Sequence, residues 1–166
     1  MKITSWNVNS INARIEHLIK FIKSDKSDIY LLQELKSVKE NFPESEIDNL
    51  GYHSYVNGQK AWNGVAILSK KKISITNSSI PKYNDINARF IETELEHLKL
   101  KNKIKLICIY LPNGNPIDTE KFDYKIEWME KFNNYIYSLK EKNIPVVIGG
   151  DFNVIPNDED VYSPEN

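Results

Sequence analysis

The chain contains 166 residues, of which 40% are hydrophobic and 27% are charged. This length and composition can bury one substantial core, so they exclude a disordered chain and favour one domain or a large part of one. The formal net charge is -1, so the protein as a whole exerts no general attraction for nucleic acid. Any binding to DNA would therefore need a local patch.

The sequence also lacks the features of a secreted or membrane protein. Residues 1–11 contain no apolar signal segment, and the longest strongly apolar run, residues 106–111, is far too short to span a bilayer. Cys108 is the only cysteine, which excludes an internal disulfide, and its strand-like surroundings predict a small buried side chain. We expect a soluble cytoplasmic protein with no membrane partner.

The N-terminal part of the chain predicts a β-α-β unit. Residues 2–8 alternate as a strand does, and residues 28–33 form a continuous apolar run that is typical of a buried strand. Between them, apolar side chains from Ile11 to Ile22 recur at helical spacing, while lysines occupy the opposite face. An amphipathic helix should therefore connect the two strands.

The rest of the chain predicts further strands and one long helix. Strand patterns occupy residues 52–56, 64–69, 73–76, 89–94 and 104–111. Apolar positions from Phe122 to Leu139 predict a helix, with Asp118 as its N-cap and with Asn143 and Pro145 closing it. Residues 146–148 then predict a last strand that is buried on both faces and ends on two glycines.

Polar side chains follow three of these strands. Asn7 lies near the end of the first strand, Glu34 directly follows the second, and Asp151 and Asn153 follow the last. Because strand ends in open α/β folds face a common rim where ligands bind, we expect these four side chains to converge. Singly, each also fits a simpler role, such as a turn cap for Asp151 or a helix-start charge for Glu34.

These residue types suit hydrolysis of a phosphodiester, which requires a cation, a positioned water and donors to the phosphate oxygens. Glu34, with help from Asn7 or Asp151, suits Mg²⁺, a hard ion that takes one or two carboxylates and keeps most of its waters. Asp151 is the candidate for accepting or orienting the water proton, and Asn153 is the candidate for donating its amide to the phosphate.

Five stretches of the sequence form a specific pattern, in residues 3–14, 28–36, 58–69, 109–114 and 147–156. They include the motifs Gln-Glu, Gln-Lys-x-x-Asn-Gly-Val-Ala and Gly-Asp-Phe-Asn. In order and spacing they resemble exonuclease III and the abasic-site endonucleases of the endonuclease/exonuclease/phosphatase superfamily. The resemblance covers the whole chain and implies a DNase I-like α/β fold, in which a β-sandwich with outer helices forms four α/β/β/α layers.

The resemblance further implies a magnesium-dependent nuclease of DNA repair, with Mn²⁺ as an alternative metal. Its implied substrate is double-stranded DNA with abasic or 3′-blocked sites, which it would cut and trim. Arg89 resembles a position that contacts the DNA backbone. The implied catalytic residues are Tyr110, Asp151 and Asn153, and the implied metal-binding residues are Asn7, Glu34, Asp151 and Asn153.

The sequence departs from the family pattern in one respect. Family members continue into a second half, where a Ser-Asp-His motif completes the active site, but none of His17, His53 and His97 follows an aspartate here. We therefore interpret residues 1–166 as a partial, truncated domain that supplies chiefly the first sheet and its helices. The inner face of that sheet would then be exposed, which predicts self-association, poor solubility or a separate C-terminal half.

Two other functions stay open at this level. One is an inactive or split half-domain, which binds metal or DNA weakly or needs a separate C-terminal chain. The other is a phosphatase or phosphodiesterase that acts on a substrate other than DNA. The Gln-Lys-x-x-Asn-Gly-Val-Ala segment argues against this second alternative.

Overall fold

The computed structural model describes residues 1–96 and 103–160, which alternate strands and helices. The first sheet contains β1 (Ile3–Asn7), β2 (Ile29–Gln33), β3 (His53–Asn57) and β4 (Val65–Ser69). The second sheet contains β5 (Ile75–Asn77), β6 (Phe90–Leu95), β7 (Ile104–Tyr110) and β8 (Val146–Asp151). The helices are α1 (Ile11–Asp25), α2 (Glu44–Asp48) and α3 (Glu120–Glu141), with short 3-10 turns at Lys39–Asn41 and Asp158–Asp160.

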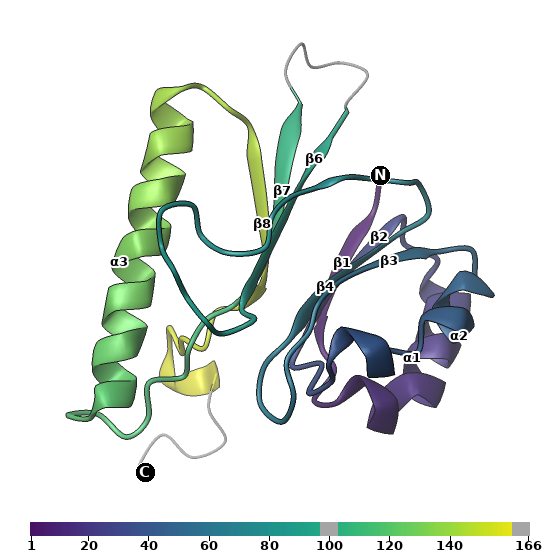
Figure 1. Ribbon diagram of the computed structural model, residues 1–166, viewed down its shortest axis with the longest axis horizontal. Helices are drawn as coiled ribbons and strands as arrows, with labels where there is room; N and C mark the ends of the chain where they lie inside the picture. The colour runs from purple at the N-terminus through teal and green to yellow at the C-terminus, as the bar shows by residue number, and fades with distance from the viewer. Residues whose placement is uncertain (97–102, 161–166) are drawn as a thin grey trace.

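The described residues form four layers. Helix α3 covers the second sheet, the two sheets face each other, and α1 and α2 cover the first sheet (Figure 1). The strand orders are β1-β2-β4-β3 and β5-β6-β7-β8. The pairs β1–β2 and β7–β8 are parallel, whereas the other neighbours are antiparallel. This arrangement confirms the predicted α/β sandwich with outer helices.

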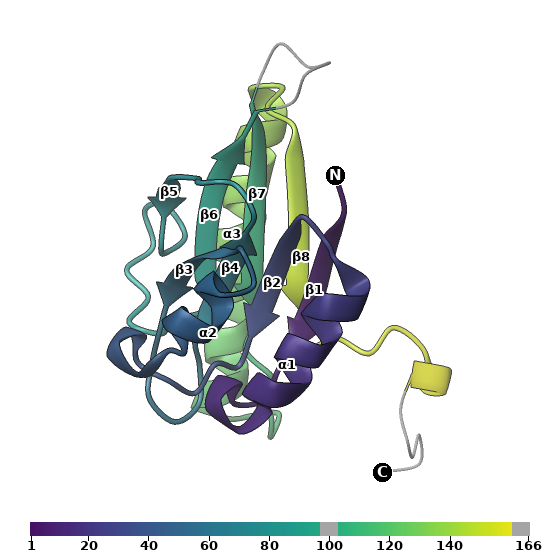
Figure 2. The same ribbon diagram turned by 90° about the vertical axis from the view of Figure 1, so that its right-hand side faces the viewer.

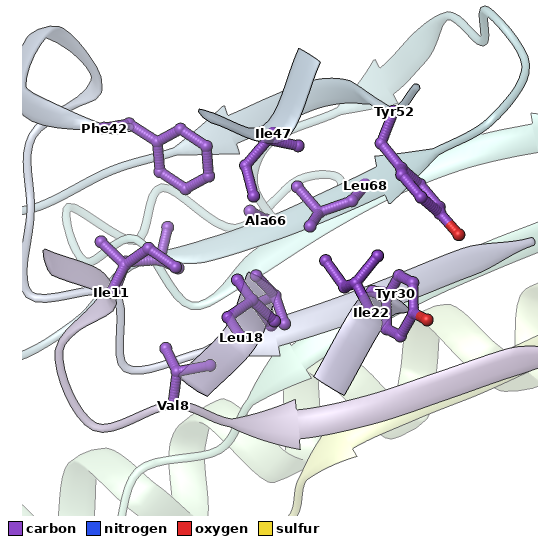
Figure 3. Packing of buried hydrophobic residues seen from close by; sticks show 12 residues of the cluster. Val8, Ile11, Leu18, Ile22, Tyr30, Phe42, Ile47, Tyr52, Ala66 and Leu68 are labelled. Atoms are coloured by element: carbon purple, nitrogen blue, oxygen red, sulfur yellow. The ribbon is translucent and has the colours of Figure 1, made fainter. Parts of the chain in front are cut away.

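Helix α1 forms where the apolar spacing predicted it, because its buried stripe packs on the outer face of the first sheet. Leu18 and Ile22 from α1 pack with Tyr30 and Leu68 from the sheet (Figure 3). Lys26 caps the end of the helix, since it takes a left-handed conformation with φ 55° and donates its N–H to the Ile22 carbonyl. The same layer includes the short helix α2, which the sequence patterns did not predict.

Helix α3 covers the second sheet through a similar stripe. Trp128 is fully buried and stacks on Phe132, with 5.3 Å between the ring centroids. The predicted N-cap, Asp118, is wrong by one residue, since Thr119 occupies that position with extended backbone angles. Asp118 itself has φ 58°, so it belongs to the preceding loop and not to the start of the helix.

The prediction that this chain supplies chiefly one sheet, with an exposed inner face, is wrong. Four strands of the second sheet lie against the first sheet and fill the space between them with apolar side chains. Leu31 and Ile67 from the first sheet pack with Leu106 and Cys108 from the second. The strands after residue 70 form this second sheet through antiparallel β5–β6 and β6–β7 pairs, and α3 provides the long crossover that the parallel β7–β8 pair needs.

Strand β8 is less buried than its apolar sequence predicts. Val147 is 38% exposed, because β8 is the last strand of its sheet and pairs only with β7 on one side. Strand β1 occupies the corresponding position in the first sheet, and both edges lie on the same side of the molecule (Figure 2). The expectation of a strand covered on both faces is therefore wrong for β8.

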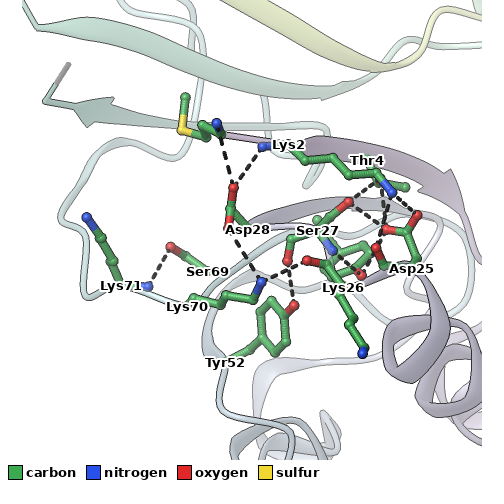
Figure 4. A network of polar contacts seen from close by, with 12 residues as sticks. Lys2, Thr4, Asp25, Lys26, Ser27, Asp28, Tyr52, Ser69, Lys70 and Lys71 are labelled. Carbon is green, nitrogen blue, oxygen red and sulfur yellow. Dashed lines mark hydrogen bonds and ion pairs between the residues drawn. The ribbon is translucent and has the colours of Figure 1, made fainter. Parts of the chain in front are cut away.

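A network of polar contacts connects the start of β1 with the end of α1 and the start of β2 (Figure 4). Asp25, at the end of α1, accepts hydrogen bonds from Lys2, Ser27 and Tyr30. The bonds from Lys2 and Ser27 hold the pKa of the Asp25 carboxyl below its ordinary value, so the group stays charged at neutral pH. Among the described residues, no helix is long and apolar enough to cross a membrane.

Candidate active site

The polar side chains that were predicted at strand ends meet at one edge of the sandwich. Asn7 is the last residue of β1, Glu34 directly follows β2, and Asp151 is the last residue of β8. These three strands point toward the same end of the molecule, the lower end in Figure 2. Tyr110 ends β7, which runs parallel to β8, so its side chain belongs to the same edge.

The side chain of Asn7 connects the two carboxylates. Its amide nitrogen donates hydrogen bonds to Glu34 Oε1 at 2.8 Å and to Asp151 Oδ2 at 2.7 Å. Its Oδ1 accepts the backbone N–H of Asn9 at 3.0 Å, which fixes the orientation of the amide. In these contacts Asn7 is a hydrogen-bond donor that both carboxylates share. Its predicted role as a ligand of the metal ion stays a prediction.

Glu34 is held as a charged group. Burial alone would raise the pKa of its carboxyl, but hydrogen bonds from Asn7, Lys36 and Tyr110 outweigh that effect and lower it. The ammonium of Lys36 lies 3.1 Å from Glu34 Oε2 and donates to Asn9 Oδ1 at 2.6 Å. Glu34 therefore presents an ionised carboxylate at neutral pH.

Several residues around the site have backbone φ angles in the left-handed region. Asn9, Ser10, Glu34, Lys36 and Asn153 all have positive φ values, between 44° and 82°. Non-glycine residues adopt this conformation at a cost of about 1–3 kcal/mol each, and such residues cluster at functional sites. Neighbouring backbone bonds hold them, including Ser10 N–H to the Glu34 carbonyl at 2.8 Å.

Two glycines permit close approaches beside these residues. Gly150 has φ 151°, and a Cβ placed on it would lie 2.0 Å from the Ile109 carbonyl oxygen. Gly64 has φ 107°, and a Cβ there would lie 2.8 Å from the Leu35 Cβ. Glycine at position 150 therefore allows β8 to lie close to β7. Glycine at position 64 allows the chain just before β4 to lie close to Leu35.

The Gln-Lys-x-x-Asn-Gly motif builds the loop next to Gly64. Gln59 Oε1 accepts the Ala88 backbone N–H and the Asn63 amide, each at 2.9 Å. Asn63 also donates to Asn87 at 3.2 Å. The motif therefore ties the loop before β4 to the loop before β6.

Tyr110 is a protonated phenol at neutral pH. Burial, and then the neighbouring Glu34 carboxylate, together raise the pKa of Tyr110 to about 12. Arg89 lies over the ring, with its guanidinium carbon 4.7 Å from the Tyr110 ring centroid. The phenol can therefore act as a hydrogen-bond donor at this edge.

Asn153 is held by the loops around it. Its amide nitrogen donates to the Leu111 carbonyl at 2.7 Å, and its backbone N–H donates to Asp151 Oδ1 at 2.9 Å. Lys125 from α3 donates to the Asn153 carbonyl at 2.7 Å. Within the described part of the chain, Asn153 Oδ1 accepts no hydrogen bond. This oxygen is therefore available to a cation or a water molecule.

An open cleft of about 630 Å³ is lined by Asn7, Gln33, Asn113, Gly150, Asp151 and Asn153, while Glu34 and Tyr110 lie outside its lining. Residues 1–96 and 103–160 contain no group of three or more His, Cys, Asp or Glu side chains that could hold a metal. The candidate donors are the carboxylates of Glu34 and Asp151, which Asn7 connects, and the amide oxygen of Asn153. Mg²⁺ fits this set, because it takes one or two carboxylates and keeps several of its waters.

Sequence patterns missed two lysines of the site. Lys36 pairs with Glu34, and Lys125 binds the carbonyls of Asn113 and Asn153. Lys36 carries one weak signal, since it lies two residues after Glu34. Lys125 carries none, because it lies 12 and 28 residues from the two residues whose carbonyls it binds, and the chain has many other lysines.

Comparison with known proteins agrees with this geometry. The model of the Endonuclease/Exonuclease/phosphatase family matches residues 4–166, and the chain belongs to that family. The exodeoxyribonuclease III of Haemophilus influenzae is 33% identical over 166 residues, which are 97% of this chain and 60% of that protein. The exodeoxyribonuclease of Bacillus subtilis is 29% identical and is covered to 63% of its length. Within the family, the chain is therefore similar to the exodeoxyribonuclease III and AP endonuclease branch.

Solved structures show the same similarity. An AP endonuclease from Archaeoglobus fulgidus superposes with a TM-score of 0.86 at 34% identity, over 99% of this chain and 62% of that one. The 3′ phosphatase NExo from Neisseria, bound to a product DNA hairpin, superposes with a TM-score of 0.87 at 33% identity and the same coverage. The chain thus spans about 60% of the length of the relatives that it matches.

Proposed function

We propose that this chain carries the phosphodiester-cleaving centre of a magnesium-dependent DNA repair nuclease, which cuts at abasic sites and trims 3′ ends. The observation that carries the proposal is the pair of hydrogen bonds from Asn7 to Glu34 and Asp151, at 2.8 Å and 2.7 Å. They bring two carboxylates from different sheets to one edge, beside Tyr110 and a free amide oxygen. Similarity to exodeoxyribonuclease III and to AP endonucleases supports DNA as the substrate.

Each residue has a chemical role in this proposal. Glu34 and Asp151 would hold Mg²⁺, with Mn²⁺ as an alternative, together with the oxygen of Asn153. The cation supplies charge that offsets the charge developing on the phosphate. Asp151 accepts or orients the proton of the attacking water, while Tyr110 donates its O–H to a phosphate oxygen. Asn7 holds the two acids at a fixed separation.

One alternative is a half-domain that is inactive alone. Residues 1–166 contain no Asp-His pair, and this is the observation on which the alternative rests. Such a chain would bind metal or DNA weakly and would gain activity only with a complementary C-terminal half or through self-association. A positioned acid-base group typically contributes ~10²- to 10⁴-fold to a rate, so loss of one can explain an inactive chain.

The proposal is tested by incision of a duplex oligonucleotide that contains one abasic site. We expect cutting with Mg²⁺, none with chelator, and slower cutting of an otherwise identical duplex without the abasic site. A soluble phosphomonoester serves as the substrate that a general phosphatase would prefer. Cutting that appears only after addition of the C-terminal part of a relative would favour the half-domain, and cutting of the phosphomonoester alone would refute the proposal.

Replacing Asn7 with leucine should weaken the site without unfolding the protein. Leucine has a similar size but donates no hydrogen bond, so Glu34 and Asp151 lose their common partner. We expect the affinity for Mg²⁺ and the incision rate to fall ~10–100-fold, the range for groups that orient metal ligands. Calorimetric titration with Mg²⁺ measures the first quantity, and Asn134→Leu, on the exposed face of α3, is the control. Unchanged affinity would contradict the role of Asn7.

A further inference from the structure

Arg89 has a set of contacts that the proposed chemistry does not use. Its guanidinium carbon lies 4.7 Å from the centroid of the Tyr110 ring and 5.8 Å from that of the Tyr124 ring. Its Nη1 donates to the Tyr110 carbonyl at 3.1 Å, and its Nε is buried without a hydrogen-bond partner. Within residues 1–96 and 103–160, no carboxylate forms an ion pair with it. Aromatic faces are therefore its main partners.

A hydrogen-bonded cluster between α3 and the loop before β6 holds the second of those rings. Tyr124 donates its O–H to Asp85 Oδ2 at 2.8 Å, and the fully buried Trp128 donates its indole N–H to the same oxygen at 3.0 Å. The Tyr124 oxygen also accepts the Asn87 amide at 3.1 Å. The Tyr124 hydroxyl is thus held by two hydrogen bonds, which restrain the ring that lies against the guanidinium.

We propose that Arg89 is a positioning residue for Tyr110, which it holds against the candidate site through its guanidinium plane and its bond to the Tyr110 carbonyl. A planar guanidinium stacks on aromatic rings and donates in a fixed fork, whereas a lysine ammonium does neither. The inference rests on the proposed role of Tyr110 as a donor to phosphate. The competing role for Arg89 is direct contact with a DNA phosphate, and the two roles predict different results.

The first experiment tests the contacts of Arg89 by NMR, in the absence of DNA and metal. The chain has only two arginines, Arg14 and Arg89, so protein labelled with ¹⁵N-arginine gives two side-chain Nε–H signals. We expect the Arg89 signal to be shifted by the two rings and to exchange slowly with water, because Nε is buried. Tyr110→Leu should move this signal and leave that of Arg14 in place. An Arg89 signal that matches Arg14 in shift and exchange would overturn the proposal.

The second experiment tests how replacement of Arg89 changes the NMR signals of the Tyr110 ring. These signals are identified by their loss in Tyr110→Phe. In Arg89→Met we expect these signals to shift and broaden, and Arg89→Lys should resemble Arg89→Met because a lysine cannot stack in this way. Arg14→Met is the matched control and should leave them unchanged. Unchanged Tyr110 signals in a folded Arg89→Met protein would refute the positioning role. If that variant is unfolded, Tyr124→Phe, which keeps the ring and loses the bond to Asp85, should instead speed exchange of the Arg89 Nε–H.

Binding to the abasic duplex separates the two roles. A positioning residue leaves the affinity and its salt dependence unchanged in Arg89→Met, while any incision falls by up to ~10²-fold through misplacement of Tyr110. A phosphate contact instead lowers the slope of log affinity against log salt by about one, and Arg89→Lys then retains most of the affinity. That second pattern would assign Arg89 to DNA. The ring and exchange measurements need no catalysis, so they can succeed even if the proposed nuclease activity fails.

Discussion

Replacing Asp151 with asparagine should reduce magnesium-dependent incision of abasic DNA by ~10²- to 10⁴-fold, the usual contribution of a positioned acid-base group. The substitution keeps the size of the side chain and an oxygen that can accept the bond from Asn7, now at 2.7 Å from Asp151 Oδ2. It removes the charge that would hold a cation and the group that we propose accepts the water proton. Single-turnover incision of the duplex at saturating Mg²⁺ measures the loss.

The matched control is Asp48→Asn, which removes one exposed carboxylate at the end of α2. Its incision rate should equal that of the unmodified chain. Thermal melting should show that both variants fold, since Asp151 lies at the edge of the sandwich. Equal incision rates for Asp151→Asn and the unmodified chain would contradict the assignment of Asp151 to the reaction.

Replacing Glu92 with alanine should cost about 3–5 kcal/mol in the free energy of unfolding, the range for breaking a buried ion pair. Glu92 on β6 is fully buried. It accepts from Lys105 at 2.7 Å, from Thr76 at 2.6 Å and from Asn77 at 2.8 Å, and Tyr135 on α3 donates to its other oxygen. Alanine would leave these donors without their common acceptor.

Glu94→Ala is the control for this prediction, because Glu94 lies on the same strand and also pairs with Lys105, at 3.5 Å. Its side chain is 36% exposed, and exposed pairs contribute ~0–1 kcal/mol. Urea unfolding of both variants gives the comparison. A Glu92→Ala protein as stable as Glu94→Ala would show that the buried pair contributes little.

The Glu92 carboxylate should also make the free energy of unfolding depend on pH. Burial would raise the pKa of Glu92, but the bonds from Lys105, Thr76, Tyr135 and Asn77 outweigh it and lower the pKa below the ordinary value of 4.5. The resulting stabilisation is fully present above pH 4.5 and is lost as the pH falls through the lower folded pKa. Glu92→Gln should flatten this part of the stability profile.

Local patterns in the sequence predicted most of the elements. The helical spacing from Ile11 to Ile22 and from Phe122 to Leu139 marked α1 and α3, because an amphipathic helix must place its apolar residues on one face. Period-two alternation and short apolar runs marked the strands. The same patterns left out α2, which is only five residues long and has a single buried side chain, Ile47.

By itself, the sequence determined the strand and helix order, the polar residues that follow the strands, and the motifs of the family. Tertiary structure alone decided which strands lie together, and it placed β5 to β8 as a second sheet against the first. It also decided that Asn7 bonds Asp151, a residue 144 positions away, and that Lys36 and Lys125 belong to the site. The reason is physical: periodicity shows which face of an element is buried, but contacts between distant residues depend on how the buried faces pack together.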